Sequence, residues 1–361
     1  MGLSLTLTDQ ELPASPAYIE FLHATLTGDA YYAGSWFRQE EENLASDDER
    51  YEGIQAKADF LVAHPQGKVW LLWSYRFFKE LLTGKLDKLR DLQRFQFYFV
   101  VGIPRTGGTY LAKQLFRAGG IDYRKVQNAL AHDGFPHLAR LQFQEGGNVH
   151  TNGLLQLAEY LCMVEVFFGR QASLQHGSRI VVPKKFTKAV YSFDLIRELF
   201  PDNARYLITV RHPLAMCQSV LDKSGGMPAD GRFAVRSAIE RWAMNDWQHW
   251  GRTEEQVLAM DYVEVMVGYW KRFYLQVAMT GMPAMPGATL VPYGAEPMTR
   301  AVEQLYAGFG VDLDPEVFKV APRPEFDVAH TAMAEQAMAD VATLWASLGM
   351  RFPTEALAPR F

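Results

Sequence analysis

The sequence is poor in cysteine and has no excess of basic charge. Its 361 residues contain two cysteines, Cys162 and Cys217, and carry a formal net charge of −5. Two cysteines give neither a metal-binding spacing nor a disulfide framework. A negative chain gives no overall electrostatic reason to bind nucleic acid. The sequence therefore predicts no metal site, no nucleic-acid partner, and buried thiols of the kind found in a reducing compartment.

Long apolar runs are also missing. The most apolar window, residues 69–82, is too short to cross a bilayer and contains Arg76 and Lys79. The first residues lack the basic and apolar regions of a signal peptide. We therefore expect a cytoplasmic protein without a transmembrane segment.

The remaining composition is typical of a large globular protein, with 48% apolar and 21% charged residues. Residues 1–95 have apolar side chains at three- and four-residue steps, which predicts mostly helix. We interpret residues 1–95 as a helical N-terminal extension that packs on the core and can line an acceptor pocket. Residues 96–361 are interpreted as an α/β domain, with the whole chain forming one globular unit.

Short buried strands alternate with helices in the middle of the chain. Strands are predicted at residues 97–101, 179–183 and 205–210, and residues 121–127 favour one more. Such an alternation predicts a central parallel sheet covered by helices on both faces, that is, a three-layer α/β sandwich. Residues 231–279 are expected to be helical, with a break at Gly251.

A Gly-rich turn directly follows the first buried strand. A strand, a tight turn and a helix start together present unpaired N–H groups and the positive end of a helix dipole, which suits an anion. An arginine and two threonine hydroxyls would add charge and hydrogen bonds. The alternative is a capped strand–turn–helix without a ligand. The turn contains neither the Gly-Lys-Ser/Thr of a Walker A loop nor Gly-x-Gly-x-x-Gly. Its residues are Pro104, Arg105, Thr106, Gly107, Gly108 and Thr109.

A second basic cluster follows the strand at residues 205–210. It consists of Arg211-His212-Pro213, with Ser219 eight residues after the arginine. A single arginine after a strand is more often an ordinary surface residue. Because the carboxyl ends of parallel strands meet at one edge of a sheet, however, we expect Arg211 to lie beside the Gly-rich turn. The two clusters therefore predict two anion sites at one edge.

Together the two clusters resemble the PAPS-dependent sulfotransferases, in particular the bacterial and Golgi-like branch of this P-loop-like sulfotransferase fold. In that family Pro-Arg/Lys-Ser/Thr-Gly-Thr-Thr holds the 5′-phosphosulfate of the donor, and Arg-Asp/Asn-Pro followed by Ser binds its 3′-phosphate. The similarity covers about residues 97–222 and continues weakly to about 313. Two positions depart from the pattern: Gly108 replaces a threonine, and His212 replaces the aspartate or asparagine.

The resemblance implies transfer of a sulfuryl group from PAPS to an acceptor hydroxyl, less readily an amine, with release of PAP. It implies that Lys185, with Lys184 as the alternative, reaches the bridging oxygen of the donor, and that Arg105 neutralises charge there. No metal is implied, since lysine and arginine supply the countercharge. The donor-binding residues that the resemblance implies are Pro104, Arg105, Thr106, Gly107, Gly108, Thr109, Tyr110, Arg211 and Ser219.

An acceptor hydroxyl also needs a general base. The resemblance places it between residues 128 and 137, where His132 is the first candidate and Asp133 and His137 follow. His150 and Glu159 remain open. Abundant tryptophan, phenylalanine and methionine favour a hydrophobic small-molecule or lipid-like acceptor. The other hypotheses are a non-catalytic PAP-binding protein and a nucleotide-dependent small-molecule kinase, and the oligomeric state is not readable from the sequence.

Overall fold

The computed structural model describes residues 3–6, 11–28, 48–127, 129–131, 151–170, 174–320 and 326–357. The chain divides into two compact units. Unit 1 comprises Met1–Tyr98, Leu115–Leu141 and Gly147–Ala204, and unit 2 comprises Phe99–Gln114, Gln142–Gly146 and Arg205–Phe361. The division passes through one strand, β3, and one helix, α5. Among the described residues, no helix combines the length and the hydropathy needed to cross a bilayer.

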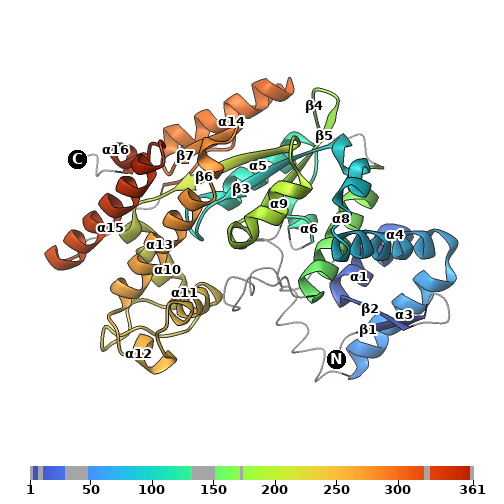
Figure 1. Cartoon of the computed structure of the whole chain (residues 1–361), viewed down its shortest axis with the longest axis horizontal. Helices are drawn as coiled ribbons and strands as arrows, with labels where there is room; N and C mark the ends of the chain where they lie inside the picture. The colour runs from blue at the N-terminus through green and yellow to red at the C-terminus, as the bar shows by residue number, and fades with distance from the viewer. Residues whose placement is uncertain are drawn as a thin grey trace. The chain divides into compact units, whose positions relative to one another are not determined.

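The fold is mixed α/β around a mostly parallel sheet of five strands, in the order β4-β5-β3-β6-β7 (Figure 1). β6 and β7 are parallel, with Tyr206 opposite Ala288 and Val210 opposite Pro292. β4 and β5 are antiparallel. The strands are β3 (Phe95–Val101), β4 (Gln175–His176), β5 (Arg179–Lys185), β6 (Ala204–Val210) and β7 (Ala288–Pro292). Every residue of β3 is buried, as an apolar central strand requires.

Unit 1 holds a group of helices that pack on one another. α4 lies along α8, and α1 packs on α3 (Figure 1, blue to green). A two-stranded antiparallel hairpin, β1 (Leu3–Thr6) with β2 (Glu11–Ala14), precedes them. The helices of this unit are α1 (Pro16–Thr27), α3 (Asp48–Ala63), α4 (Pro65–Leu82), η1 (Leu86–Arg94), α6 (Tyr123–Val126), α8 (Thr151–Phe168), η3 (Lys188–Ser192) and α9 (Phe193–Leu199).

Unit 2 is built around α13, which packs against α10, α11 and α15. A buried aromatic cluster of Trp270, Tyr274, Trp345 and Phe352 fixes this packing, with ring centroids 4.9–5.9 Å apart. The helices of unit 2 are α5 (Gly108–Ala118, shared with unit 1), α10 (Pro213–Ser224), α11 (Ala238–His249), α12 (Glu254–Leu258), α13 (Tyr262–Met279), η4 (Met282–Ala284), α14 (Ala295–Phe309), α15 (Val328–Ser347) and α16 (Thr354–Leu357).

The strands predicted at residues 97–101, 179–183 and 205–210 are confirmed as β3, β5 and β6. The strand predicted at residues 121–127 is wrong, because the short helix α6 occupies Tyr123–Val126. The side chain of Asp122 accepts a hydrogen bond from the backbone N–H of Arg124 at 3.0 Å and caps this helix. A local cap of this kind outweighs the strand preference of the flanking β-branched residues.

Two broader expectations gain detail from the structure. The described part of residues 1–95 is mostly helical, as predicted, and the short hairpin of β1 and β2 precedes the first helix. Residues 231–279 form three helices rather than two, each opened by a capping side chain, Ser237, Thr253 or Asp261. The break predicted at Gly251 is confirmed, since its φ of +84° lies in the left-handed region just after α11.

Candidate functional site: an arginine-rich edge of the sheet

The turn between β3 and α5 starts at a glycine that packs against the neighbouring strand. A Cβ atom on Gly102 would lie 2.1 Å from Oγ1 of Thr209 on β6 and 2.7 Å from Oγ1 of Thr106. Real side chains do not approach so closely, so only glycine fits here. The close approach holds the exit of β3 against β6 within unit 2.

Hydrogen bonds of buried hydroxyl groups stabilise the turn and the adjacent end of β6. Thr106 donates to the carbonyl oxygen of Ile103 at 2.7 Å and lies 2.8 Å from the hydroxyl of Thr209. Tyr274 of α13 donates to the carbonyl oxygen of Thr209 at 2.7 Å. Of the two threonines expected to add hydroxyl groups to the site, Thr106 is 1% exposed and engaged internally. Thr109 is exposed at the start of α5.

Arg105 adopts a left-handed backbone conformation, with φ of +73°, and no other described non-glycine residue has a positive φ. This conformation costs roughly 1–2 kcal/mol for a residue with a side chain, so the surrounding structure must compensate for it. The carbonyl oxygen of Arg105 accepts a hydrogen bond from Nη1 of Arg211 at 2.9 Å. Its side chain reaches the other way, where Nε donates to Oγ of Ser219 at 3.0 Å.

Arg211, directly after β6, is a buried cation. Its relative exposure is 4%, and its Nε has no hydrogen-bond partner among the described residues. Its guanidinium lies over the ring of Tyr293, 3.9 Å from the centroid. Burial lowers the pKa of Arg211 below its ordinary value, and the charge of Arg105 acts in the same direction, whereas Tyr293 and Asp222 oppose the shift. In the described chain, no carboxylate forms an ion pair with Arg105 or Arg211.

These contacts bring the two basic clusters together, as the sequence predicts. Arg105 and Arg211 lie at one edge of the sheet in hydrogen-bond contact. Ser219, expected to act with Arg211 on one anion, also lies against the first cluster, because its hydroxyl accepts a hydrogen bond from Nε of Arg105 at 3.0 Å. The two clusters therefore form one continuous cationic site, built from the ends of β3 and β6 and from α10.

His212 stands where the motif of the sulfotransferases has aspartate or asparagine, and it caps the helix that follows. Its Nδ1 accepts a hydrogen bond from the N–H of Leu214 at 3.3 Å and caps α10, with Pro213 at the first helical position. An aspartate or asparagine would make the same kind of cap. Histidine thus preserves the start of α10 and, with it, the direction in which Arg211 leaves β6.

Sequence reasoning missed Tyr293 and Phe318. Tyr293 follows β7, and its N–H donates to the carbonyl oxygen of Val210 at 2.7 Å, so a third strand end contributes to the site. The signal available in the sequence was an aromatic residue directly after a short strand. Phe318 lies in residues 311–320, which form no helix or strand, and had no such signal. Tyr110, which the resemblance implies for the donor site, donates its hydroxyl to the carbonyl oxygen of Glu316 at 2.7 Å.

The remaining candidates belong to unit 1 or lie outside the described residues. Lys184 is 2% exposed, with its ammonium 4.5 Å from the ring centroid of Tyr160, and Lys185 at the end of β5 is half-buried. Glu159 is 1% exposed and accepts a hydrogen bond from the N–H of Ser15 at 2.8 Å. The base candidates outside the described residues are His132, Asp133, His137 and His150.

Comparisons with known proteins leave the family open. No protein-family model matches the chain, and no curated protein matches it. Among solved structures, the chain is similar to a sulfotransferase from Mycobacterium tuberculosis H37Rv, with 15% sequence identity and a TM-score of 0.36. That match covers 95% of this chain and 92% of the other. A TM-score this low carries no argument about fold or activity, so the function has to be argued from the site itself.

Proposed function

We propose that this protein transfers a sulfuryl group from PAPS to the hydroxyl of a hydrophobic small-molecule or lipid-like acceptor and releases PAP, using the three-layer sulfotransferase form of the α/β fold. The single observation that carries the proposal is Arg211. A guanidinium that is 4% exposed, touches a second arginine and has no carboxylate partner in the described chain needs an anion to balance it. The sequence motifs around it supply the identity of that anion.

PAPS fits this arrangement because it carries an anionic group at each end, and when bound it supplies the activated sulfuryl group. Arg211 would hold the 3′-phosphate through donors such as its unpartnered Nε. The guanidinium of Arg105 and the first N–H groups of α5 would hold the 5′ end. Ser219 keeps the Arg105 side chain oriented through its hydrogen bond. Gly107 would keep the turn in its left-handed conformation, Gly108 and Thr109 would present their N–H groups to the 5′ end, and Pro104 would fix the entry to the turn.

The chemical step needs two further roles, both assigned here from the sequence motifs. Lys185 would stabilise the charge that develops on the leaving phosphate. His132, or else Asp133 or His137, would accept the proton of the acceptor hydroxyl. Among the described residues, no cluster of histidine, cysteine and acidic side chains has the arrangement of a metal site. We assign the countercharge to lysine and arginine.

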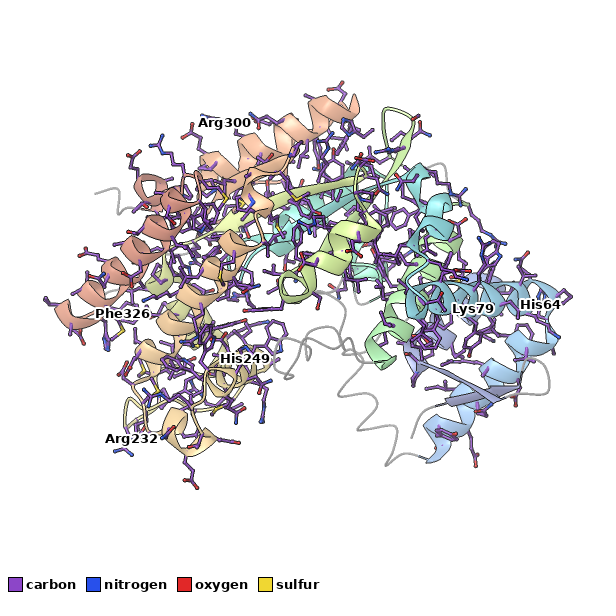
Figure 2. All side chains as sticks on the ribbon, viewed as in Figure 1. His64, Lys79, Arg232, His249, Arg300 and Phe326 are labelled. Atoms are coloured by element: carbon purple, nitrogen blue, oxygen red, sulfur yellow. The ribbon has the colours of Figure 1, made fainter. Side chains whose placement is uncertain are left out.

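Calorimetry with PAP and with ADP tests the donor site, because only PAP carries the 3′-phosphate that Arg211 is proposed to bind. We expect PAP to bind the wild-type protein at least tenfold more tightly than ADP. Arg211→Ala should weaken PAP binding by about 10- to 100-fold, since each hydrogen bond to a charged group contributes about 1.5–3 kcal/mol. Arg232→Ala is the matched control, because Arg232 is exposed near α12 (Figure 2).

Product analysis separates an enzyme from a binding protein. Radiolabelled PAPS is incubated with a panel of apolar alcohols and phenols, and sulfated product is measured by mass spectrometry. Equal affinity for PAP and ADP would contradict the proposed donor site. Tight PAP binding without sulfated product from any acceptor would support the non-catalytic alternative, and phosphorylated product from ATP would support a kinase.

A further inference from the structure

A segment without helix or strand, residues 311–320, is bound to α5 beside the anion site. Its anchor is Glu316, whose carbonyl oxygen accepts from the Tyr110 hydroxyl at 2.7 Å. The N–H of Glu316 donates to Oε1 of Gln114 at 3.2 Å, and its carboxylate pairs with Lys113 at 2.6 Å. Three contacts to three polar side chains of α5, Tyr110, Lys113 and Gln114, fix the register of the segment on the helix. The residue two places further on is therefore also fixed.

That residue, Phe318, is the apolar centre of the segment. Its relative exposure is 8%, whereas its neighbour Val317 is 84% exposed. The Phe318 ring lies 4.8 Å from the ring of Tyr110 and 5.1 Å from the ring of Tyr293, edge-on to both. Aromatic pairs at such distances attract one another beyond their buried area. Phe318 thus bridges a side chain of α5 and the residue that follows β7.

Both bridged elements touch the anion site. Tyr293 carries the guanidinium of Arg211 on its face, 3.9 Å from the ring centroid. Phe318 also covers the Gly-rich turn, since a Cβ atom on Gly107 would lie 3.6 Å from its Cζ and 2.4 Å from Cε of Met298. Gly107 has a φ of +93°, so a side chain there would be strained as well as crowded.

We propose that Phe318 is a positioning residue of the anion site, which wedges between Tyr110 and Tyr293 and thereby fixes the guanidinium of Arg211 and the backbone at Gly107. Removing the wedge takes away the edge-on contact of Phe318 with the Tyr293 ring, so the surface that orients the donors of Arg211 is held less firmly. Preformed donors bind an anion more tightly than donors that must first be ordered. The inference depends on the proposed function only for its choice of PAP as the probe.

The first test is PAP affinity by calorimetry in Phe318→Ala. The loss of two ring contacts should raise the dissociation constant about tenfold. Phe318→Leu, which restores apolar volume, should recover most of that loss. Phe233→Ala is the matched control, because Phe233 is 3% exposed in the same unit and packs on Tyr262 at the start of α13. It should lower the melting temperature while leaving PAP affinity unchanged. An equal loss of affinity in both alanine variants would overturn the proposal.

The second test needs no nucleotide. The Nε–H signal of Arg211 is followed by NMR in arginine-labelled protein and assigned by its loss in Arg211→Lys. A fixed, buried Nε–H gives a sharp signal in wild-type protein, which should broaden or exchange faster in Phe318→Ala and persist in Phe233→Ala. If wild-type protein does not bind PAP, the proposed function fails and this signal alone decides the inference. Its persistence in Phe318→Ala, or its absence from wild-type protein, would overturn the role of Phe318.

Discussion

Unit 2 contains two arginines, buried Arg211 and half-buried Arg272, whose guanidinium groups both lie over an aromatic ring. Arg211 lies 3.9 Å above the ring of Tyr293, and Arg272 lies 3.9 Å above the ring of Trp247. Each has one buried nitrogen without a hydrogen-bond partner among the described residues. Arg272, however, forms an ion pair with Asp246, which is 2% exposed.

The difference separates a structural cation from one that is available to a ligand. Arg272 of α13 and Asp246 of α11 form an ion pair, so each charge is balanced by the other within the folded protein. Arg211 is held by a carbonyl oxygen and an aromatic face, neither of which cancels its charge. Burying a cation without a counterion costs free energy. Such unbalanced charges are concentrated at binding and catalytic sites, where a ligand supplies the opposite charge.

The largest expected effect is on the free energy of unfolding, when the charge of Arg272 and that of Arg211 are removed in separate variants. Arg272→Met should lower the free energy of unfolding by about 3–5 kcal/mol at pH 8, because it leaves the Asp246 carboxylate buried and unpaired. The free energy of unfolding of Arg211→Met should be within about 1 kcal/mol of the wild-type value or higher, because this substitution removes an unbalanced buried charge. Urea unfolding at pH 8 measures both. Equal losses in the two variants would mean that Arg211 is also balanced within the fold.

The pH dependence of stability sharpens the same comparison. Burial raises the pKa of Asp246 from 3.8 to about 6, although Arg272 opposes the shift. Between these values the folded protein holds a proton that the unfolded chain has lost, so stability falls as pH rises from about 4 to about 6 and then levels off. Asp246→Asn should abolish this step, which amounts to at most about 3 kcal/mol. Unfolding curves from pH 4 to 7 test it, and an identical profile in the variant would contradict the shift.

The smallest expected effect is on PAP affinity, when the aromatic ring beneath the guanidinium of Arg211 is removed. Both arginines have such a ring. Tyr293→Leu removes the ring beneath Arg211, and an interaction of this kind contributes about 0.5–2 kcal/mol. PAP affinity measured by calorimetry should fall about threefold to tenfold. Tyr293→Phe keeps the ring and should bind as wild type does. A loss of affinity in Tyr293→Phe as large as in Tyr293→Leu would assign the effect to the phenol oxygen instead of the ring face.

The sequence predicts the part of this site that depends on strand ends. Apolar runs before Gly102 and Arg211 mark β3 and β6, and adjacent parallel strands necessarily deliver the residues after them to one edge. Sequence reasoning could not place Ser219 against Arg105, because that contact depends on the rotamer of a long side chain. It also could not find Phe318, because residues 311–320 have no periodicity and are placed by the individual contacts of Glu316.

The left-handed conformation of Arg105 means that this residue acts through two chemically separate halves. Its carbonyl oxygen accepts a hydrogen bond from Arg211, and its guanidinium donates one to Ser219. Truncation to alanine deletes the second half and keeps the first, so an alanine scan undercounts what this position contributes. Only a change in the main chain itself, such as an ester in place of the peptide bond between residues 105 and 106, which weakens the Arg105 carbonyl oxygen as an acceptor, would report the other half.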